Sequence, residues 1–182
     1  IATISCLKDL GAKIEIDGNK AVVYGIENNS KKETVNLFCN ESGSTLRFLI
    51  PLSLVFSNNA TFSGSDRLLE RPQSVYEELF SNMGCYLKKE EKSLVAGGEL
   101  KSGAYKIRGD ISSQFLTGLL FALPLLDGDS DIVLTTPLQS SPYVDITIDV
   151  LSKFGVDIKK SDTAPEKYYE GKDGYQMQRE GF

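Results

Sequence analysis

The chain has 182 residues, of which 41% are hydrophobic and 25% charged, and its formal net charge is −5. This composition is that of an ordinary globular protein, and the negative charge argues against a general nucleic-acid binder, which needs a broad basic surface. The chain contains no histidine, so imidazole acid–base chemistry, a Ser-His-Asp triad and histidine metal ligands are excluded within it.

The cysteines and the apolar segments indicate the compartment. Cys6, Cys39 and Cys85 are widely spaced and form no CxxC motif, so we expect reduced, mostly buried thiols in a reducing compartment. The longest apolar run, 115–126, is too short to span a membrane, and no signal peptide is evident. We therefore predict a cytoplasmic protein with no membrane, nucleic-acid, metal or cofactor partner. Because the sequence lacks an initiator methionine and opens within a helical pattern, we expect it to be a piece of a longer protein.

Taken in chain order, the first element is a helix that ends at Leu10-Gly11, followed by a strand, a polar turn and a second strand. The same pattern returns after Met83-Gly84 and after Phe154-Gly155. The three glycines are 84 − 11 = 73 and 155 − 84 = 71 positions apart. Each stands where the end of a helix favours a residue that tolerates a positive φ. This spacing predicts an internal repeat.

The segments between these glycines predict the rest of each repeat. Strands are expected at 34–39, 61–63, 104–108 and 131–135, and two serine-led helices that are apolar on all sides follow the first and third of them. Amphipathic helices are expected to start at Pro72 and Pro142, because proline suits the first helical position. The strands of 156–182 are not defined by the pattern, although 168–182 has the composition of a hairpin.

Together these elements predict an α+β fold of repeated βαβαββ units around a pseudo-threefold axis. The buried helices are expected inside and the sheets and amphipathic helices outside. We expect one domain, 1–182, with the tail of one unit in 1–30, a second unit in 31–100 and a third in 101–182. The functional sites should lie at the N-termini of the buried helices, the end that must reach the surface.

Two such helix starts have the residues of an anion-binding cradle. Ser42-Gly43-Ser44-Thr45 and Ser112-Ser113-Gln114 combine small residues, hydroxyl groups and free backbone N–H groups. Ordinary N-capping is the alternative reading of both, and it stays open at this point. Ser140-Ser141-Pro142-Tyr143 repeats the pattern at the next helix, where an N-cap followed by a packing tyrosine is again the alternative.

Four arginines lie near these helix starts. Arg47 is in the first turns of an apolar helix, where a cation is unfavourable by about 0.3–1 kcal/mol unless an anion is bound nearby. Arg71 and Arg108 follow predicted elements and are candidates for bidentate phosphate or carboxylate contacts, whereas Arg67 is better explained as a surface charge.

Four ordered motifs give the chain a family resemblance over nearly its whole length. They are E-S-G-S-T-L-R-F-L-I-P, D-R-L-L-E-R-P, G-D-I-S-S-Q-F-L-T-G-L-L and S-S-P-Y-V-D-I-T-I. In this order and spacing they resemble the 5-enolpyruvylshikimate-3-phosphate synthase family. The resemblance implies the enolpyruvyl transferase fold and a two-domain enolpyruvyl transferase, of which this chain is the first domain. It also implies transfer of the enolpyruvyl group of phosphoenolpyruvate to the 5-hydroxyl of shikimate 3-phosphate, with release of phosphate, in the pathway to chorismate and aromatic amino acids.

The resemblance also assigns roles to individual residues. It implies that Ser112 and Ser113 hold shikimate 3-phosphate, that Gln114 contacts both substrates, that Ser140 binds a phosphate and that Tyr143 lines the ring pocket. It further implies that Gly43 offers its backbone to phosphoenolpyruvate, that Arg71 clamps that substrate's charge, and that Arg47 and Ser44 support the site.

The acid–base residues of the family match no part of this sequence, so we expect them in a second domain and expect the isolated chain to be inactive. Two alternatives remain. A UDP-N-acetylglucosamine enolpyruvyl transferase belongs to the same superfamily, but the Ser-Ser-Gln motif and the lack of a cysteine-bearing loop before Arg71-Pro72 speak against it. A non-catalytic binding module that kept only the cradles is the second alternative.

Overall fold

A computed structural model of the chain defines the placement of residues 2–26, 31–161 and 174–178. The strands are β1 (Lys13–Asp17), β2 (Lys20–Gly25), β3 (Lys32–Phe38), β4 (Ser57–Ser63), β5 (Cys85–Lys89), β6 (Leu94–Gly98), β7 (Ala104–Ile107), β8 (Ser130–Leu134), β9 (Asp157–Ser161) and β10 (Gly174–Gln178). The helices are α1 (Ala2–Leu10), α2 (Gly43–Phe56), α3 (Asp66–Leu69), α4 (Ser74–Ser81), α5 (Ser113–Ala122) and α6 (Ser141–Lys153), with one 3-10 turn, η1 (Leu123–Leu125).

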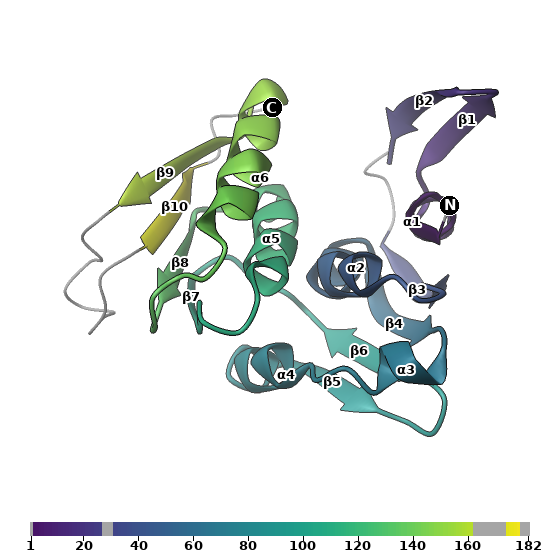
Figure 1. Cartoon of the computed structure of the whole chain (residues 1–182), viewed down its shortest axis with the longest axis horizontal. Helices are drawn as coiled ribbons and strands as arrows, with labels where there is room; N and C mark the ends of the chain where they lie inside the picture. Colours follow the sequence, from purple (N-terminus) through teal and green to yellow (C-terminus); the bar gives the residue numbers. More distant parts are fainter. Residues whose placement is uncertain (1, 27–30, 162–173, 179–182) are drawn as a thin grey trace.

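Two sheets of four strands have the same topology. Their strand orders are β3-β4-β6-β5 and β7-β8-β10-β9. In each sheet the first two strands are parallel and joined through a buried helix, and the other two pairings are antiparallel. Figure 1 shows the two sheets on opposite sides of the molecule, with α2 and α5 between them. The predicted fold class of repeated βαβαββ units with helices inside is confirmed.

The hairpins that follow α1 and α4 form as predicted. β1 pairs antiparallel with β2, and β5 with β6. Gly11, Gly84 and Gly155, which end the preceding helices, have φ values of 118°, 76° and 81°, a region that residues with a side chain rarely enter. β9 pairs with β10, but the rest of the predicted 168–182 hairpin lies outside the described residues. The border between units at residue 30 also lies outside them, and the division into units stays a prediction.

The four predicted strands form with shifted ends. The largest shift is in β4, which starts at Ser57, directly after α2, instead of at residue 61. Asn58 and Asn59 favour turns when considered alone. In the structure β4 has partners on both sides: Asn59 is level with Thr34 of β3 and with Gly97 of β6. Pairing with both neighbours therefore overrides the local preference.

The predicted helix start at Pro72 is wrong. α4 begins at Ser74 with Gln73 as its N-cap, and Pro72 lies in the connection after α3, a short helix that the sequence pattern did not predict. Pro142 does lie in the first turn of α6. In this position the Pro72 carbonyl oxygen accepts a hydrogen bond from Nη2 of Arg47 at 3.4 Å.

The two apolar helices form the centre of the core. α2 has no exposed residue, and in α5 most residues are buried. They pack on each other more extensively than any other pair of helices. We predicted that α2 is buried on all sides, and this is wrong. One part of its surface is only partly buried, at Phe48, Leu52, Val55 and Phe56.

Tyr76 of α4 forms hydrogen bonds to both α2 and α5. Its side chain is fully buried, and its hydroxyl donates to the backbone carbonyl oxygens of Arg47 at 2.9 Å and Phe115 at 2.8 Å. Its ring meets the ring of Phe115 edge to face, with centroids 4.9 Å apart. A Cβ at Gly118 would overlap the Tyr76 hydroxyl and lie 2.6 Å from the Arg47 carbonyl oxygen. The close approach of α2 and α5 therefore requires glycine at this position.

Two further observations concern the cysteines and the length of the helices. All three cysteines are free and buried, as predicted. Among the residues that the structure describes, no helix is both long and apolar enough to cross a membrane.

We expect Gly118→Ala to destabilise the protein. The added methyl group meets backbone and a hydrogen-bonded hydroxyl, so α2 and α5 must move apart, at a cost of about 1–3 kcal/mol. Alanine's better helix propensity offsets up to about 1 kcal/mol of this. The measurement is the midpoint of urea unfolding, with Glu77→Ala on the exposed side of α4 as the control. An unchanged midpoint for Gly118→Ala would show that the helices are not held at this distance.

Candidate anion-binding site

The site lies where the parallel strands β7 and β8 end. Ile107 is level with Leu134 in the register, so the connections that follow the two strands leave the same edge of the sheet. One leads to α5 and the other to α6. The backbone N–H of Gln139 donates to the carbonyl oxygen of Gly109 at 3.0 Å, which ties the two connections together. A Cβ at Gly109 would lie 2.9 Å from the Thr136 carbonyl oxygen, so only glycine permits this contact.

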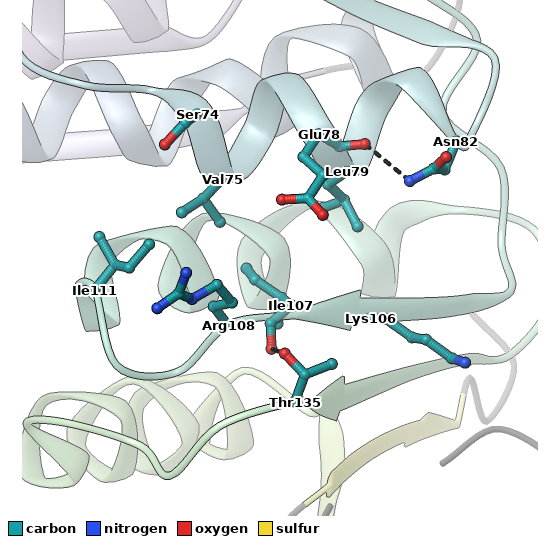
Figure 2. Close-up of a pocket in the computed structure, with 10 residues that line it drawn as sticks. All are labelled: Ser74, Val75, Glu78, Leu79, Asn82, Lys106, Ile107, Arg108, Ile111 and Thr135. Carbon is teal, nitrogen blue, oxygen red and sulfur yellow. Dashed lines mark hydrogen bonds between the residues drawn. The ribbon is translucent and has the colours of Figure 1, made fainter. Parts of the chain in front are cut away.

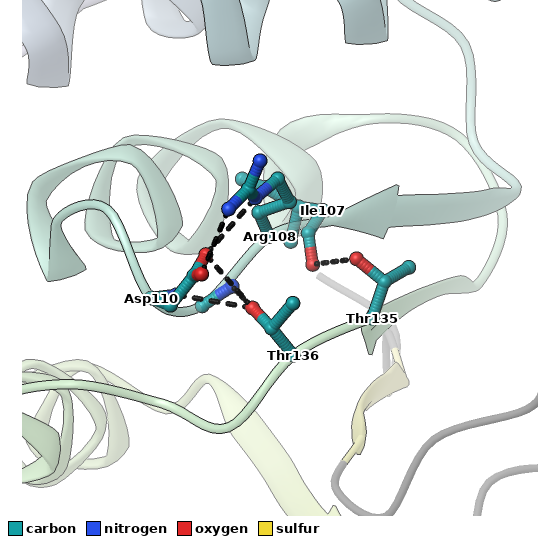
Figure 3. A network of polar contacts seen from close by, with 6 residues as sticks. Ile107, Arg108, Asp110, Thr135 and Thr136 are labelled. Atoms are coloured by element: carbon teal, nitrogen blue, oxygen red, sulfur yellow. Dashed lines mark hydrogen bonds and ion pairs between the residues drawn. The ribbon is translucent and has the colours of Figure 1, made fainter.

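A polar network fixes the connection before α5 (Figure 3). The Thr136 hydroxyl accepts from the backbone N–H groups of Gly109 and Asp110, at 3.0 and 3.2 Å, and donates to the Asp110 carboxylate at 3.0 Å. Arg108 donates two hydrogen bonds to the same carboxylate, at 3.0 and 2.8 Å. These bonds from Arg108, followed by the Thr136 bond, lower the pKa of Asp110 to about 2. The network therefore holds the start of α5 beside the start of α6.

A cavity of about 520 Å³ opens at these helix starts. Six of the nine residues predicted for the site line it, namely Ser44, Ser112, Ser113, Gln114, Ser140 and Tyr143. Gly43, Arg47 and Arg71 do not. The remaining lining residues are Phe48, Thr117, Phe121, Ile146 and Thr147. No charged side chain is among the lining residues, so no carboxylate opposes an anion inside the cavity.

The serine hydroxyls at the helix starts have different roles. Ser112 caps α5, where its oxygen accepts from the backbone N–H of Gln114 at 3.3 Å. Ser42 caps α2 in the same way through Thr45. The capping alternative is thus correct for these two residues, although each hydroxyl keeps a hydrogen to donate.

Ser140 differs from these caps. It is the N-cap of α6, but its side chain makes no capping bond and its backbone is left-handed, with φ 63° and ψ 42°. The other non-glycine residue with a positive φ among those described, Asn40, precedes α2. Such backbone strain costs of order 1–3 kcal/mol and collects at binding sites.

Arg71 and Arg47 lie beside the cavity, at the start of α2. A Cβ at Gly43 would overlap Nη1 of Arg71, so the guanidinium of Arg71 lies directly against the first residue of the helix. The pKa of Arg47 is lowered, first by burial and then by the positive charge of Arg71. Within the described residues neither arginine forms an ion pair with a carboxylate. Two cations thus share one helix N-terminus, a position that favours an anion.

The sequence analysis missed the apolar and threonine part of the lining. Thr117 and Phe121 follow Gln114 on α5 at helical spacing, and Ile146 and Thr147 follow Tyr143 on α6 in the same way. The hydroxyls of Thr117 and Thr147 are 3.4 Å apart across the two helices. Helical spacing from the predicted residues is the signal that identifies this wall.

Phe48 and Phe121 close the apolar side of the cavity. Their rings meet edge to face, with centroids 5.5 Å apart. Phe48 is on α2, so only the packing of α2 on α5 brings these two residues together.

A second cavity, of about 320 Å³, lies between α4 and the end of β7 (Figure 2). Arg108 lines it, but Glu78 does too, and Arg108 is already bound to Asp110. The bidentate contact predicted for Arg108 is thus made with a carboxylate of the chain itself, that of Asp110, and Arg108 does not line the cavity at the helix starts. No group of three or more potential metal ligands occurs among the described residues.

The fold and the cavity define a class of protein: an α+β protein of βαβαββ repeats with a cavity at helix N-termini. The sequence matches the family EPSP synthase (3-phosphoshikimate 1-carboxyvinyltransferase) over residues 1–179. The chain is 52% identical over 157 residues to the 3-phosphoshikimate 1-carboxyvinyltransferase of Clostridium kluyveri, covering 85% of this chain and 37% of that one. It is 46% identical over 164 residues to that of Clostridium perfringens, covering 88% and 38%.

The chain therefore belongs to the EPSP synthase family. Its fold is similar to that of the EPSP synthase of Acinetobacter baumannii, with a TM-score of 0.68 at 22% identity, over 99% of this chain and 39% of the other. The chain spans a little over a third of the length of the curated relatives it matches.

We expect Asp110 to make the stability of the protein depend on pH. Its pKa is about 2 in the folded protein and about 3.9 in an unfolded chain, so its stabilising effect is fully present above about pH 5. The effect is lost as the pH falls through about 2. The difference in urea midpoint between the wild type and Asp110→Asn should therefore shrink from pH 6 to pH 2. Asp17→Asn, an exposed carboxylate in β1, is the control. A difference that stays constant with pH would contradict the network.

Proposed function

We propose that this chain forms the shikimate 3-phosphate side of the active site of an EPSP synthase. The whole protein would transfer the enolpyruvyl group of phosphoenolpyruvate to the 5-hydroxyl of shikimate 3-phosphate and release phosphate. Membership of the family supports this activity, and the known relatives are much longer than the chain. The partner of the chain would then be a second domain of the same protein. The predicted cytoplasmic location is part of the proposal.

One observation carries the proposal: the cavity combines a polar end with an apolar end. Ser112, Ser113 and Ser140 surround the helix starts, where hydroxyl and backbone N–H donors suit a phosphate. Phe121 and the exposed Ile146 also line the cavity and suit the carbon ring that bears the phosphate. The exposed ring of Tyr143 stands at the rim, where it can pack on the same ring.

Phosphoenolpyruvate is proposed to bind next to this cavity, at the start of α2. Ser44 belongs both to the cavity and to α2, so the two anions would lie side by side. Gly43 offers backbone there without a side chain, and the guanidinium of Arg71 lies against it. Gln114 is bonded to Arg47 of α2 and lines the cavity, so it lies between the two subsites.

The reaction itself needs groups that this site does not offer. Addition to the enolpyruvyl double bond requires a proton donor for carbon and a base for the attacking hydroxyl. The cavity is lined by hydroxyl, amide, phenol and apolar groups. Its residues can bind and orient substrates, while acid–base catalysis and exclusion of water require a second wall. We therefore assign those tasks to the second domain.

The expected result for the chain is weak binding without turnover. Titration with shikimate 3-phosphate, followed by 15N NMR, should shift the backbone amide signals of Ser113, Gln114 and Tyr143. Ser113→Ala should weaken this binding by roughly tenfold, the effect of one charge-assisted hydrogen bond, while Ser152→Ala on the exposed face of α6 should not. Addition of phosphoenolpyruvate should release no phosphate. Turnover by the chain, or UDP-N-acetylglucosamine shifting the same signals instead, would refute the proposal.

Gly43→Ala should separate folding from binding. The new methyl group would displace only the end of a flexible arginine side chain, so the urea midpoint should change little. Displacement of Arg71 removes a charge-assisted contact, so affinity for phosphoenolpyruvate in the longer protein should fall by roughly 10- to 100-fold. Its affinity for shikimate 3-phosphate should stay nearly unchanged. Equal losses for both substrates would show that Arg71 does not define the second subsite.

A further inference from the structure

Arg47 holds the side chain of Gln114 through its guanidinium. Nη1 donates to Oε1 of Gln114 at 3.0 Å, and Nη2 donates to the Pro72 carbonyl oxygen at 3.4 Å. The centre of the guanidinium lies 4.6 Å from the ring centroid of Phe115, a cation–π distance. Arg47 thus connects α2, α5 and the segment before α4, and its position is fixed from three directions.

The contact with Arg47 determines the orientation of the Gln114 side-chain amide, that is, where its oxygen and its NH2 group point. A guanidinium has only N–H donors, so the amide atom beside it must be the oxygen. The amide nitrogen of Gln114 has no hydrogen-bond partner among the described residues, and it is not among their buried, unpartnered atoms. Since Gln114 lines the cavity, this NH2 group is the end left to face it.

We propose that Arg47 is a positioning residue that fixes the Gln114 amide with its oxygen toward α2 and its NH2 group toward the cavity. Gln114 then offers only donors at this point. The site would select acceptor groups on its ligand, such as phosphate, carboxylate or hydroxyl oxygens, and reject donors. This inference rests on the proposed function for the identity of the ligand, but the orientation of the amide can be tested without any ligand.

The charge of Arg47 strengthens the same selection. Its Nε atom is buried without a partner in the described part of the chain. With no ion pair to a described carboxylate, its field acts on the amide it holds. A cation bonded to the oxygen polarises the amide and makes the opposite N–H bonds better donors.

The closest approach of the two helices is made by groups other than the Arg47 side chain. The Tyr76 hydroxyl binds the backbone carbonyl of Arg47, not its guanidinium, and the close contact at Gly118 also involves backbone. A positioning role and a structural role therefore predict different results. Arg47→Met should disturb the amide, and Tyr76→Phe should disturb stability only.

The ligand-free test is 15N relaxation of the Gln114 side-chain amide. In the wild type we expect an ordered amide with two separate hydrogen signals. In Arg47→Met its order parameter should fall to that of a solvent-exposed glutamine such as Gln139. Tyr76→Phe should lower the urea midpoint and leave the Gln114 amide ordered. An amide that stays ordered in Arg47→Met, or that loses order equally in Tyr76→Phe, overturns the proposal.

The binding test is a double-mutant cycle with shikimate 3-phosphate and, separately, inorganic phosphate. Arg47→Met and Gln114→Met should each raise the dissociation constant for shikimate 3-phosphate by roughly tenfold, and the double variant should be no worse than Gln114→Met alone. Additive losses would show that Arg47 acts independently of Gln114 and would overturn the proposal.

A second variant, Gln114→Glu, tests the proposal in case Arg47→Met does not fold. It replaces the NH2 donor of the side chain with an acceptor oxygen. Gln114→Glu keeps the bond to Arg47 but turns an acceptor into the cavity, so it should weaken binding more than Gln114→Met does. Equal losses for the two variants would contradict the donor assignment. If the wild type binds neither probe, the proposed function fails, while the relaxation result still decides the orientation of the amide.

Discussion

The site depends on the distance between two buried helices. α2 and α5 approach until residue 118 has no room for a side chain, and one buried hydroxyl, that of Tyr76, binds a carbonyl oxygen on each of them. Neither helix can slide or rotate without breaking these hydrogen bonds. Because both helices begin at the same cavity, this contact sets the distance between their first residues. The orientation of the donor groups within the cavity depends on other side chains, such as Arg47, which binds Gln114.

The repeated topology explains why several helix starts meet at one place. In each unit a parallel pair of strands is joined through a buried helix, and the amphipathic helix follows the second strand. The connections after parallel strands leave the same edge of a sheet, where ligands of α/β folds commonly bind. In the second of the two sheets, Thr136 and Gly109 hold these connections together. The chain needs no special loop to build the site.

Much of this could be predicted from the sequence, because the signals are local or repeated. Glycine spacing and serine-led apolar runs predicted the repeated order of elements, and the helix-start serines predicted one end of the cavity. The rest depends on contacts between distant segments. No local sequence pattern predicts the left-handed backbone of Ser140 or the hydrogen bond from Arg47 to the Pro72 carbonyl oxygen. The apolar wall was predictable in principle from helical spacing, but Phe48 joins it only through the packing of α2 on α5.

The same features that build the site also weigh against the stability of the unliganded protein. The half-buried cation of Arg47 in the first turns of α2 opposes the helix dipole, and Arg71 beside it adds repulsion. Strain in the backbone of Asn40 and Ser140 adds to this cost. An anion bound at the helix starts would offset each of these unfavourable contributions. It would attract both guanidinium groups and the backbone N–H dipoles, and it would stabilise the strained connections. The cost concentrated at this edge, together with the absence of carboxylates from the cavity, is the physical reason to expect an anionic ligand there.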